Sequence, residues 1–69
     1  MNEDITELLE ELIDKHGILH VLTGLECVCT EKADHIRVNW QDKELARRWD
    51  RVARKIYIAA NCAQENELP

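Results

Sequence analysis

Residues 18–37, ILHVLTGLECVCTEKADHIR, carry the apolar pattern that decides the fold. Apolar side chains recur there every three or four residues, which is the spacing of one face of an α-helix. The stripe consists of Ile18, Val21, Leu22, Leu25, Val28, Cys29, Ala33 and Ile36. At 1.5 Å per residue, such a helix is about 30 Å long. The pattern therefore predicts a long central helix over about residues 18–37.

A shorter apolar stripe begins at Ile5, before the central helix. Asp4 stands in front of it and can accept hydrogen bonds from the free amides of a first helical turn. Gly17 provides the left-handed residue that commonly ends a helix. These signals predict a first helix over about residues 5–16.

A third stripe follows a polar turn at residues 38–42, where Asn39 or Asp42 can cap the next helix. It is centred on Trp49 and predicts a helix over about residues 42–63. Residues 64–69 have no periodicity and are predicted to form a flexible tail. The 69-residue chain contains no alternating strand pattern and no repeat. It is therefore predicted to be one all-α domain over residues 1–63, a three-helix bundle with a long central helix.

The size of the chain limits its core. A domain this small buries only about 60% of its unfolded surface, and natural examples add disulfides, a metal or oligomerisation. Three cysteines form no complete disulfide set and are expected to be reduced. Trp40 and Trp49 are both expected to pack, with Trp40 closing the open end of the bundle. We therefore expect a homo-oligomer, with a dimer favoured, or another protein partner.

The sequence also indicates a compartment. No apolar run approaches the roughly 20 residues that span a bilayer, and the acidic N-terminus lacks the basic segment of a signal peptide. The chain is therefore expected to be cytoplasmic, without a membrane contact.

The net charge of −5 is distributed unevenly. Bases gather on the outer face of the third helix, and we call this set the basic face: Lys43, Arg47, Arg48, Arg51, Arg54 and Lys55. Such a face suits phosphates or an acidic protein, but Glu44 and Asp50 can neutralise part of it. The acidic net charge opposes approach to a polyanion. A solvated face is therefore favoured, and nucleic-acid binding is retained as the alternative.

The first helix carries the opposite charge. Its acids are Glu3, Glu7, Glu10, Glu11 and Asp14. They can imitate phosphates toward a basic partner, face the third helix within the bundle or across a dimer, or simply be hydrated. A hydrated acidic side is the favoured interpretation.

A second side of the central helix is a candidate interaction face. It contains His20, Gly24, Cys27, Glu31 and His35. Glycine inside a helix costs up to about 1 kcal/mol relative to alanine, but it lets another backbone approach closely. This side is interpreted either as the contact with a partner or second copy, or as an exposed face with one tolerated glycine.

Metal binding and catalysis are not expected. Cys27 and Cys29 point to different sides of a helix, and His20 is about 10 Å of helical rise from Cys27. The chain has no serine and no glycine-rich phosphate loop. We predict no catalytic residues, no metal and no cofactor, with Cys29 as a small core residue.

Residues 31–42, EKADHIRVNWQD, followed by Ala46 and Trp49, resemble the central segment of short, uncharacterised helical proteins of bacteria and phages. The likeness extends over about residues 18–60. It implies a small bacterial or mobile-element protein and brings no activity or ligand. It draws attention to a set at the corner between the second and third helices, which we call the corner set: Lys32, Arg37, Asn39, Trp40, Gln41 and Asp42. Together with His35, these residues are expected to form a capping network or a binding spot.

These observations favour a small non-enzymatic protein that acts through its helix faces as a homo-oligomeric interaction or regulatory protein. Nucleic-acid binding through the basic face is the alternative.

Overall fold

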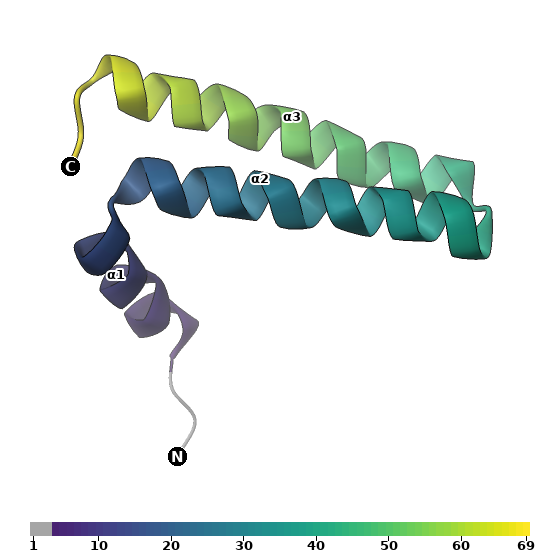
Figure 1. Ribbon diagram of the computed structural model, residues 1–69, viewed down its shortest axis with the longest axis horizontal. Coiled ribbons are helices and arrows are strands. Elements are labelled where there is room, and N and C mark those ends of the chain that lie inside the picture. Colours follow the sequence, from purple (N-terminus) through teal and green to yellow (C-terminus); the bar gives the residue numbers. More distant parts are fainter. Residues whose placement is uncertain (1–3) are drawn as a thin grey trace.

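The computed structural model describes residues 4–69, which form an all-α fold (Figure 1). α1 spans Ile5–His16, α2 spans Ile18–His35, and α3 spans Lys43–Glu65. A π-helical turn, η1 (Ile36–Trp40), continues α2 up to the corner that leads into α3. The predicted all-α class and long central helix are therefore confirmed.

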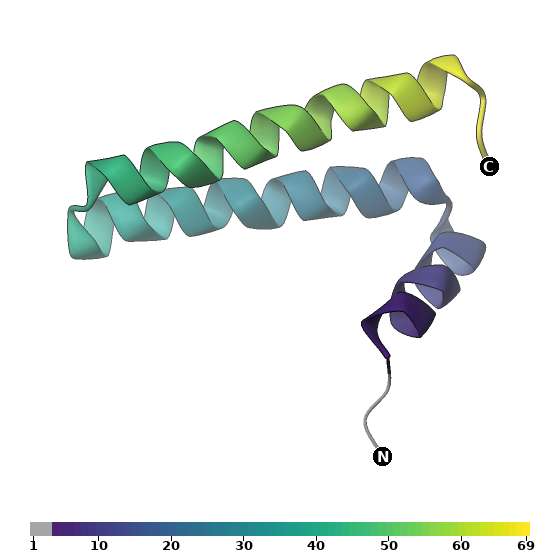
Figure 2. The same cartoon turned by 180° about the vertical axis from the view of Figure 1, so that it is seen from behind.

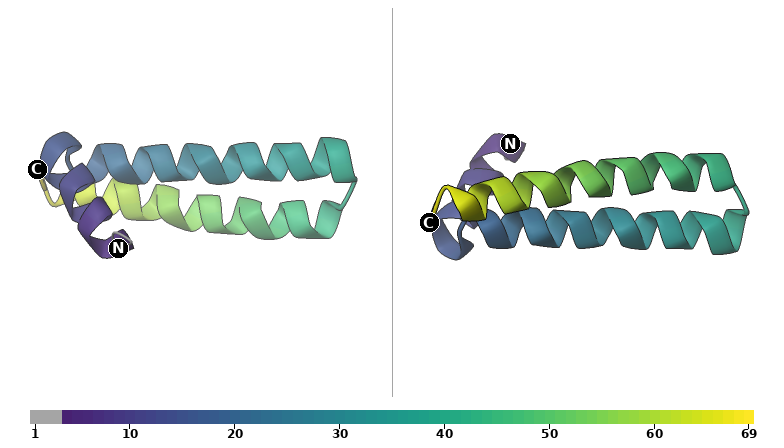
Figure 3. Two further views of the ribbon diagram at one scale, coloured as in Figure 1. Left: turned by 90° about the horizontal axis from the view of Figure 1, so that it is seen from below. Right: turned by 90° about the horizontal axis from the view of Figure 1, so that it is seen from above.

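α2 and α3 form an antiparallel hairpin, and α1 leaves it as an arm. The two long helices lie side by side along their whole length in every view (Figures 1, 2 and 3). α1 starts from the end of the hairpin that lies opposite the corner and points away from it (Figure 1). Among the described residues, α1 contacts α2 but not α3.

Small side chains hold the two long helices together. Ala46, Ala53 and Ala60 lie seven residues apart on α3, and all three are buried. Cys29 and Ala33 are the buried residues of α2, and the predicted core position of Cys29 is thereby confirmed. A seven-residue repeat keeps one face of a helix against its neighbour. The seam therefore lets the helices approach closely, but it buries little apolar surface.

The first helix and one tryptophan contribute less to the core than expected. α1 has no buried residue, and its Ile5 is 69% exposed. Trp49 is partly buried against the core, whereas Trp40 is 67% exposed, so the expectation that it closes the bundle is wrong. The reason is the course of the chain: α1 lies at the far end of the hairpin, and nothing in the described residues covers the corner.

The elbow between α1 and α2 depends on Gly17, whose φ of 88° and ψ of 152° suit glycine almost alone. The last residues of the chain return to this elbow. The amide of Ile18 donates to the carbonyl of Pro69 at 3.1 Å, and the amide of Leu68 donates to the carbonyl of Ala63 at 3.2 Å. The first hydrogen bond ties the end of the chain to the start of α2, and the second ties it to the end of α3.

Candidate functional site

A continuous apolar surface runs over one side of the molecule. Four hollows follow one another on this side, and each shares a lining residue with the next. Val28 lines the first and second hollows, Trp49 lines the second and third, and Val52 lines the third and fourth. We call this surface the apolar face, and its main members are Leu9, Leu12, Val21, Leu25, Val28, Trp40, Trp49, Val52 and Ile56. All three helices contribute to it. Such a surface is typical of a protein contact.

The first hollow lies in the angle between α1 and α2 and has a volume of about 550 Å³. Leu9 and Leu12 form its α1 wall, and Leu25 belongs to the α2 wall. Gly24 lies in this hollow, and a Cβ added to it would meet no atom within 4 Å. Within a single chain, therefore, no neighbour requires glycine at this position.

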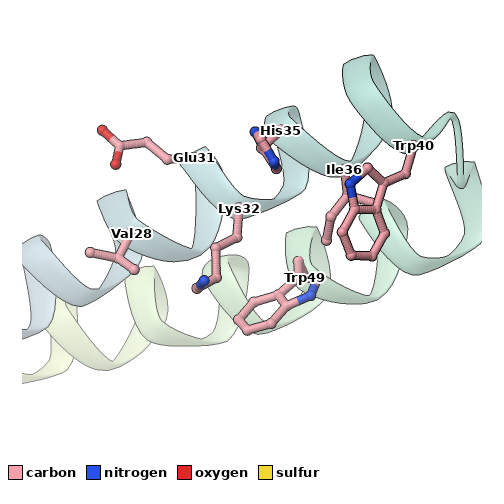
Figure 4. A pocket seen from close by; sticks show the side chains of 7 residues that line it. All are labelled: Val28, Glu31, Lys32, His35, Ile36, Trp40 and Trp49. Carbon is pink, nitrogen blue, oxygen red and sulfur yellow. The ribbon is translucent and has the colours of Figure 1, made fainter.

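The second hollow, of about 380 Å³, lies near the corner (Figure 4). Trp40 from η1 and Trp49 from α3 point to the same side of the hairpin there (Figure 4). The Lys32 Nζ lies 5.7 Å from the centre of the Trp49 ring, which is the range of a cation–π contact. Glu31 and His35 form its polar rim. This hollow combines large apolar rings with a few charged groups.

The candidate interaction face of α2 forms one edge of the apolar face. His20 and Gly24 line the first hollow, and Glu31 and His35 line the second. Cys27 lies beside Glu31. Sequence reasoning found this edge but missed the contributions of α1 and α3. The available signal was the width of the apolar stripes, which exceed what one neighbouring helix can cover.

The corner set divides into two groups. Arg37 bridges Asp34 at 2.9 Å and Asp50 at 2.6 Å, and the second pair ties η1 to α3. The Asn39 amide donates to the carbonyl of His35 at 3.1 Å, and a carboxylate oxygen of Asp42 accepts from the amide of Leu45 at 3.0 Å.

The other three members of the corner set have different places. Lys32 and Trp40 line the second hollow instead. Gln41 adopts the left-handed conformation, with a φ of 56°. Of the corner set, Asn39 and Asp42 therefore bond to backbone groups at helix ends, and Arg37 forms ion pairs.

The basic face is exposed and only partly neutralised. Arg47 and Arg48 lie 3.5 Å and 3.9 Å from carboxylate oxygens of Glu44. Within the described residues, four of the bases have no acidic partner within 4.0 Å: Lys43, Arg51, Arg54 and Lys55. Arg48, Arg51 and Lys55 border the apolar face beside Val52 and Ile56. The apolar face therefore has a basic margin along α3.

α1, which carries the acids, lies at the end of the hairpin opposite the corner (Figure 1), whereas the basic face occupies the part of α3 from the corner to its middle. Glu7, Glu10, Glu11 and Asp14 have no basic partner within 4.0 Å in the part of the chain that the structure describes, and Glu3 lies outside that part. The two oppositely charged sets of one chain do not meet.

The thiols offer little chemistry. The Cys27 Sγ donates to a carboxylate oxygen of Glu31 at 3.6 Å, and the negative charge of Glu31 raises the pKa of the Cys27 thiol. Cys29 is buried, and all three cysteines are free. Residues 4–69 contain no group of three His, Cys, Asp or Glu side chains that could hold a metal ion.

None of the described helices combines the length and the apolar character needed to cross a membrane. No family model, curated protein or solved structure matches the chain. The resemblance of residues 31–42 to short bacterial and phage proteins therefore stays a prediction.

Proposed function

We propose that this chain is a non-enzymatic protein-interaction module that acts as a homodimer through its apolar face. One observation carries the proposal: large apolar side chains from three helices are exposed on one side, whereas the core between α2 and α3 consists mostly of alanines. Val28, where the two main hollows meet, is 47% exposed. A second copy would complete this core.

The amount of exposed surface supports an extensive contact. The accessible surface is 5762 Å², whereas a compact protein of 8.1 kDa exposes about 4,500 Å². The surplus is about 1,300 Å² per chain, and a standard interface covers about 800 Å² per partner. The radius of gyration is 14.1 Å, compared with about 11 Å for a compact chain of this length. The surplus accessible surface and the large radius of gyration both fit a protomer whose contact surface exceeds about 800 Å².

The surroundings of the apolar face support binding without catalysis. Its hollows are open and mainly apolar, and the exposed thiol at its edge, Cys27, is weakened as a nucleophile by Glu31. Three free cysteines support a reducing compartment, and a cytoplasmic location is therefore part of the proposal.

Light scattering coupled to size exclusion tests the proposal. The unchanged chain is expected to have twice the mass of 8.1 kDa. Val28→Glu places a charge at the centre of the apolar face and is expected to give a monomer that keeps its helical circular dichroism. Thr30→Glu is the matched control, because it puts the same charge at another exposed position on α2 and should stay dimeric. A monomeric unchanged chain at millimolar concentration would contradict the proposal.

A second candidate function is nucleic-acid binding through the basic face. It is favoured by the four bases of α3 that lack an acidic partner in the described residues. An electrophoretic shift across a salt series separates the two candidates. A shift that weakens steeply with salt supports nucleic-acid binding, and no shift at low salt excludes it.

A further inference from the structure

We infer that two copies pair antiparallel across their apolar faces, so that the acidic α1 of each copy lies against the basic corner of the other. This inference rests on the proposed homodimer and specifies its occupant and orientation. It starts from the separation of charge within one chain. Unpaired acids lie on the arm at one end of the hairpin. The two bases that border the apolar face in the half of α3 nearest the corner are Arg48 and Arg51, and we call them the basic corner.

The shape of the chain permits this arrangement. α1 leaves the hairpin on the side of the apolar face, because Leu9 and Leu12 share a hollow with Val28. Its 12 residues extend about 18 Å, whereas packed helical layers lie roughly 8–10 Å apart. The arm is therefore long enough to reach past the hairpin of a second copy. With a two-fold axis across the hairpins, each arm meets the other copy's corner.

The charges select the antiparallel orientation. In a parallel pair, the two arms would lie together with their glutamates facing each other, and the two basic corners would also meet. Like charges placed opposite each other oppose association. In the antiparallel pair, Glu10 and Glu11 of each arm approach Arg48 and Arg51 of the other copy. Arg48 and Arg51 border the apolar face, so they are placed to meet a helix that lies on it.

The exposed apolar side chains point to the same contact. Trp40 at the corner and Ile5 on the arm are each about two-thirds exposed, at 67% and 69%. They lie at opposite ends of the molecule, so no rearrangement of the hairpin alone covers both. Each end of an antiparallel pair holds the Trp40 of one copy and the Ile5 of the other, so the pair covers both residues of both copies.

Exchange of charges between two variants tests the orientation. The arm variant carries Glu10→Arg and Glu11→Arg, so its arms and corners are both basic. The corner variant carries Arg48→Glu and Arg51→Glu, so both are acidic. Each variant alone is expected to associate at least about tenfold more weakly than the unchanged chain, because every arm–corner contact becomes repulsive. An equimolar mixture is expected to restore the unchanged affinity within about threefold, as a heterodimer seen in native mass spectrometry.

A matched control keeps the charge change but moves it off the apolar face. Arg47→Glu with Arg54→Glu makes the same reversal on α3, at exposed positions that line no hollow of the apolar face. This variant is expected to associate like the unchanged chain. Circular dichroism confirms that each variant keeps its helices.

The outcomes separate the inference from the proposed function. In a parallel dimer, the arm and corner variants would associate like the unchanged chain, since like charges would only be replaced by other like charges, and their mixture would bind more tightly. That result overturns the antiparallel orientation and leaves the homodimer standing. A monomeric unchanged chain removes both.

Discussion

Cys27 and Glu31 lie one helical turn apart on α2, and the Cys27 thiol donates a hydrogen bond to the Glu31 carboxylate at 3.6 Å. Because the pKa of Cys27 is raised, the thiolate forms only at higher pH than in an ordinary cysteine. We expect Glu31→Gln to lower this pKa and to speed alkylation of Cys27 at neutral pH by roughly two- to fivefold. The difference should disappear at a pH well above both pKa values. Iodoacetamide labelling followed by peptide mass spectrometry measures it.

Cys62 serves as the internal control, because it is also exposed and does not contact Glu31. Its labelling rate should be the same in both chains. Equal rates for Cys27 in the two chains would show that Glu31 does not govern the thiol.

Residues whose role depends on a few neighbours in the sequence were predictable. The caps at Asp4 and Asp42 follow from local hydrogen bonds, and both occur in the structure. The glycine that ends α1 follows from its backbone freedom. Trp40 was not predictable in this way, because its exposure depends on the π-helical turn and on the distant position of α1.

At the scale of the element, the elbow between α1 and α2 determines the shape of the chain. A Cβ on Gly17 would lie 3.2 Å from the Pro69 carbonyl carbon, in a backbone conformation that other residues rarely adopt. We expect Gly17→Ala to lower the free energy of unfolding by about 1–3 kcal/mol. Gly24→Ala, in open space inside α2, is expected to raise it by up to about 1 kcal/mol. Urea unfolding followed by circular dichroism, at one chain concentration, compares the two variants.

The two glycines form a matched pair because both substitutions add one methyl group. A loss of stability at both positions would mean that the Cβ of residue 24 meets something the single chain does not contain. An equal increase in the free energy of unfolding for both variants would mean that the elbow does not need the unusual backbone conformation of Gly17.

Helix positions were predictable from the spacing of apolar residues, but the choice of contacting faces was not. The apolar stripes of α2 and α3 are wider than the strip that one neighbouring helix covers. The sequence was therefore compatible with two different contact faces between these helices. The repeat of Ala46, Ala53 and Ala60 favours close approach, and the larger side chains beside it, such as Trp49 and Ile56, are left on the apolar face. The same excess width explains why only the α2 edge of the candidate site was found from the sequence.

At the scale of the whole molecule, association should supply part of the stability of the fold. The hairpin buries mostly small side chains, and α1 buries none. Such a core contributes little free energy relative to the conformational entropy lost when residues 4–69 become ordered. A second copy that covers the apolar face adds the missing burial, so the stability of the fold should depend on chain concentration.

Thermal unfolding at different concentrations measures this coupling. A hundredfold increase in concentration favours the dimer by about 2.7 kcal/mol, or about 1.4 kcal/mol per chain. Since 1 kcal/mol shifts the midpoint of a domain this small by about 4–8 °C, we expect Tm to rise by about 6–11 °C. Val28→Glu should remove the dependence and leave the low Tm of a single chain, while Thr30→Glu should retain it. A Tm of the unchanged chain that stays constant over this range would mean that the hairpin and its arm are stable without a second copy.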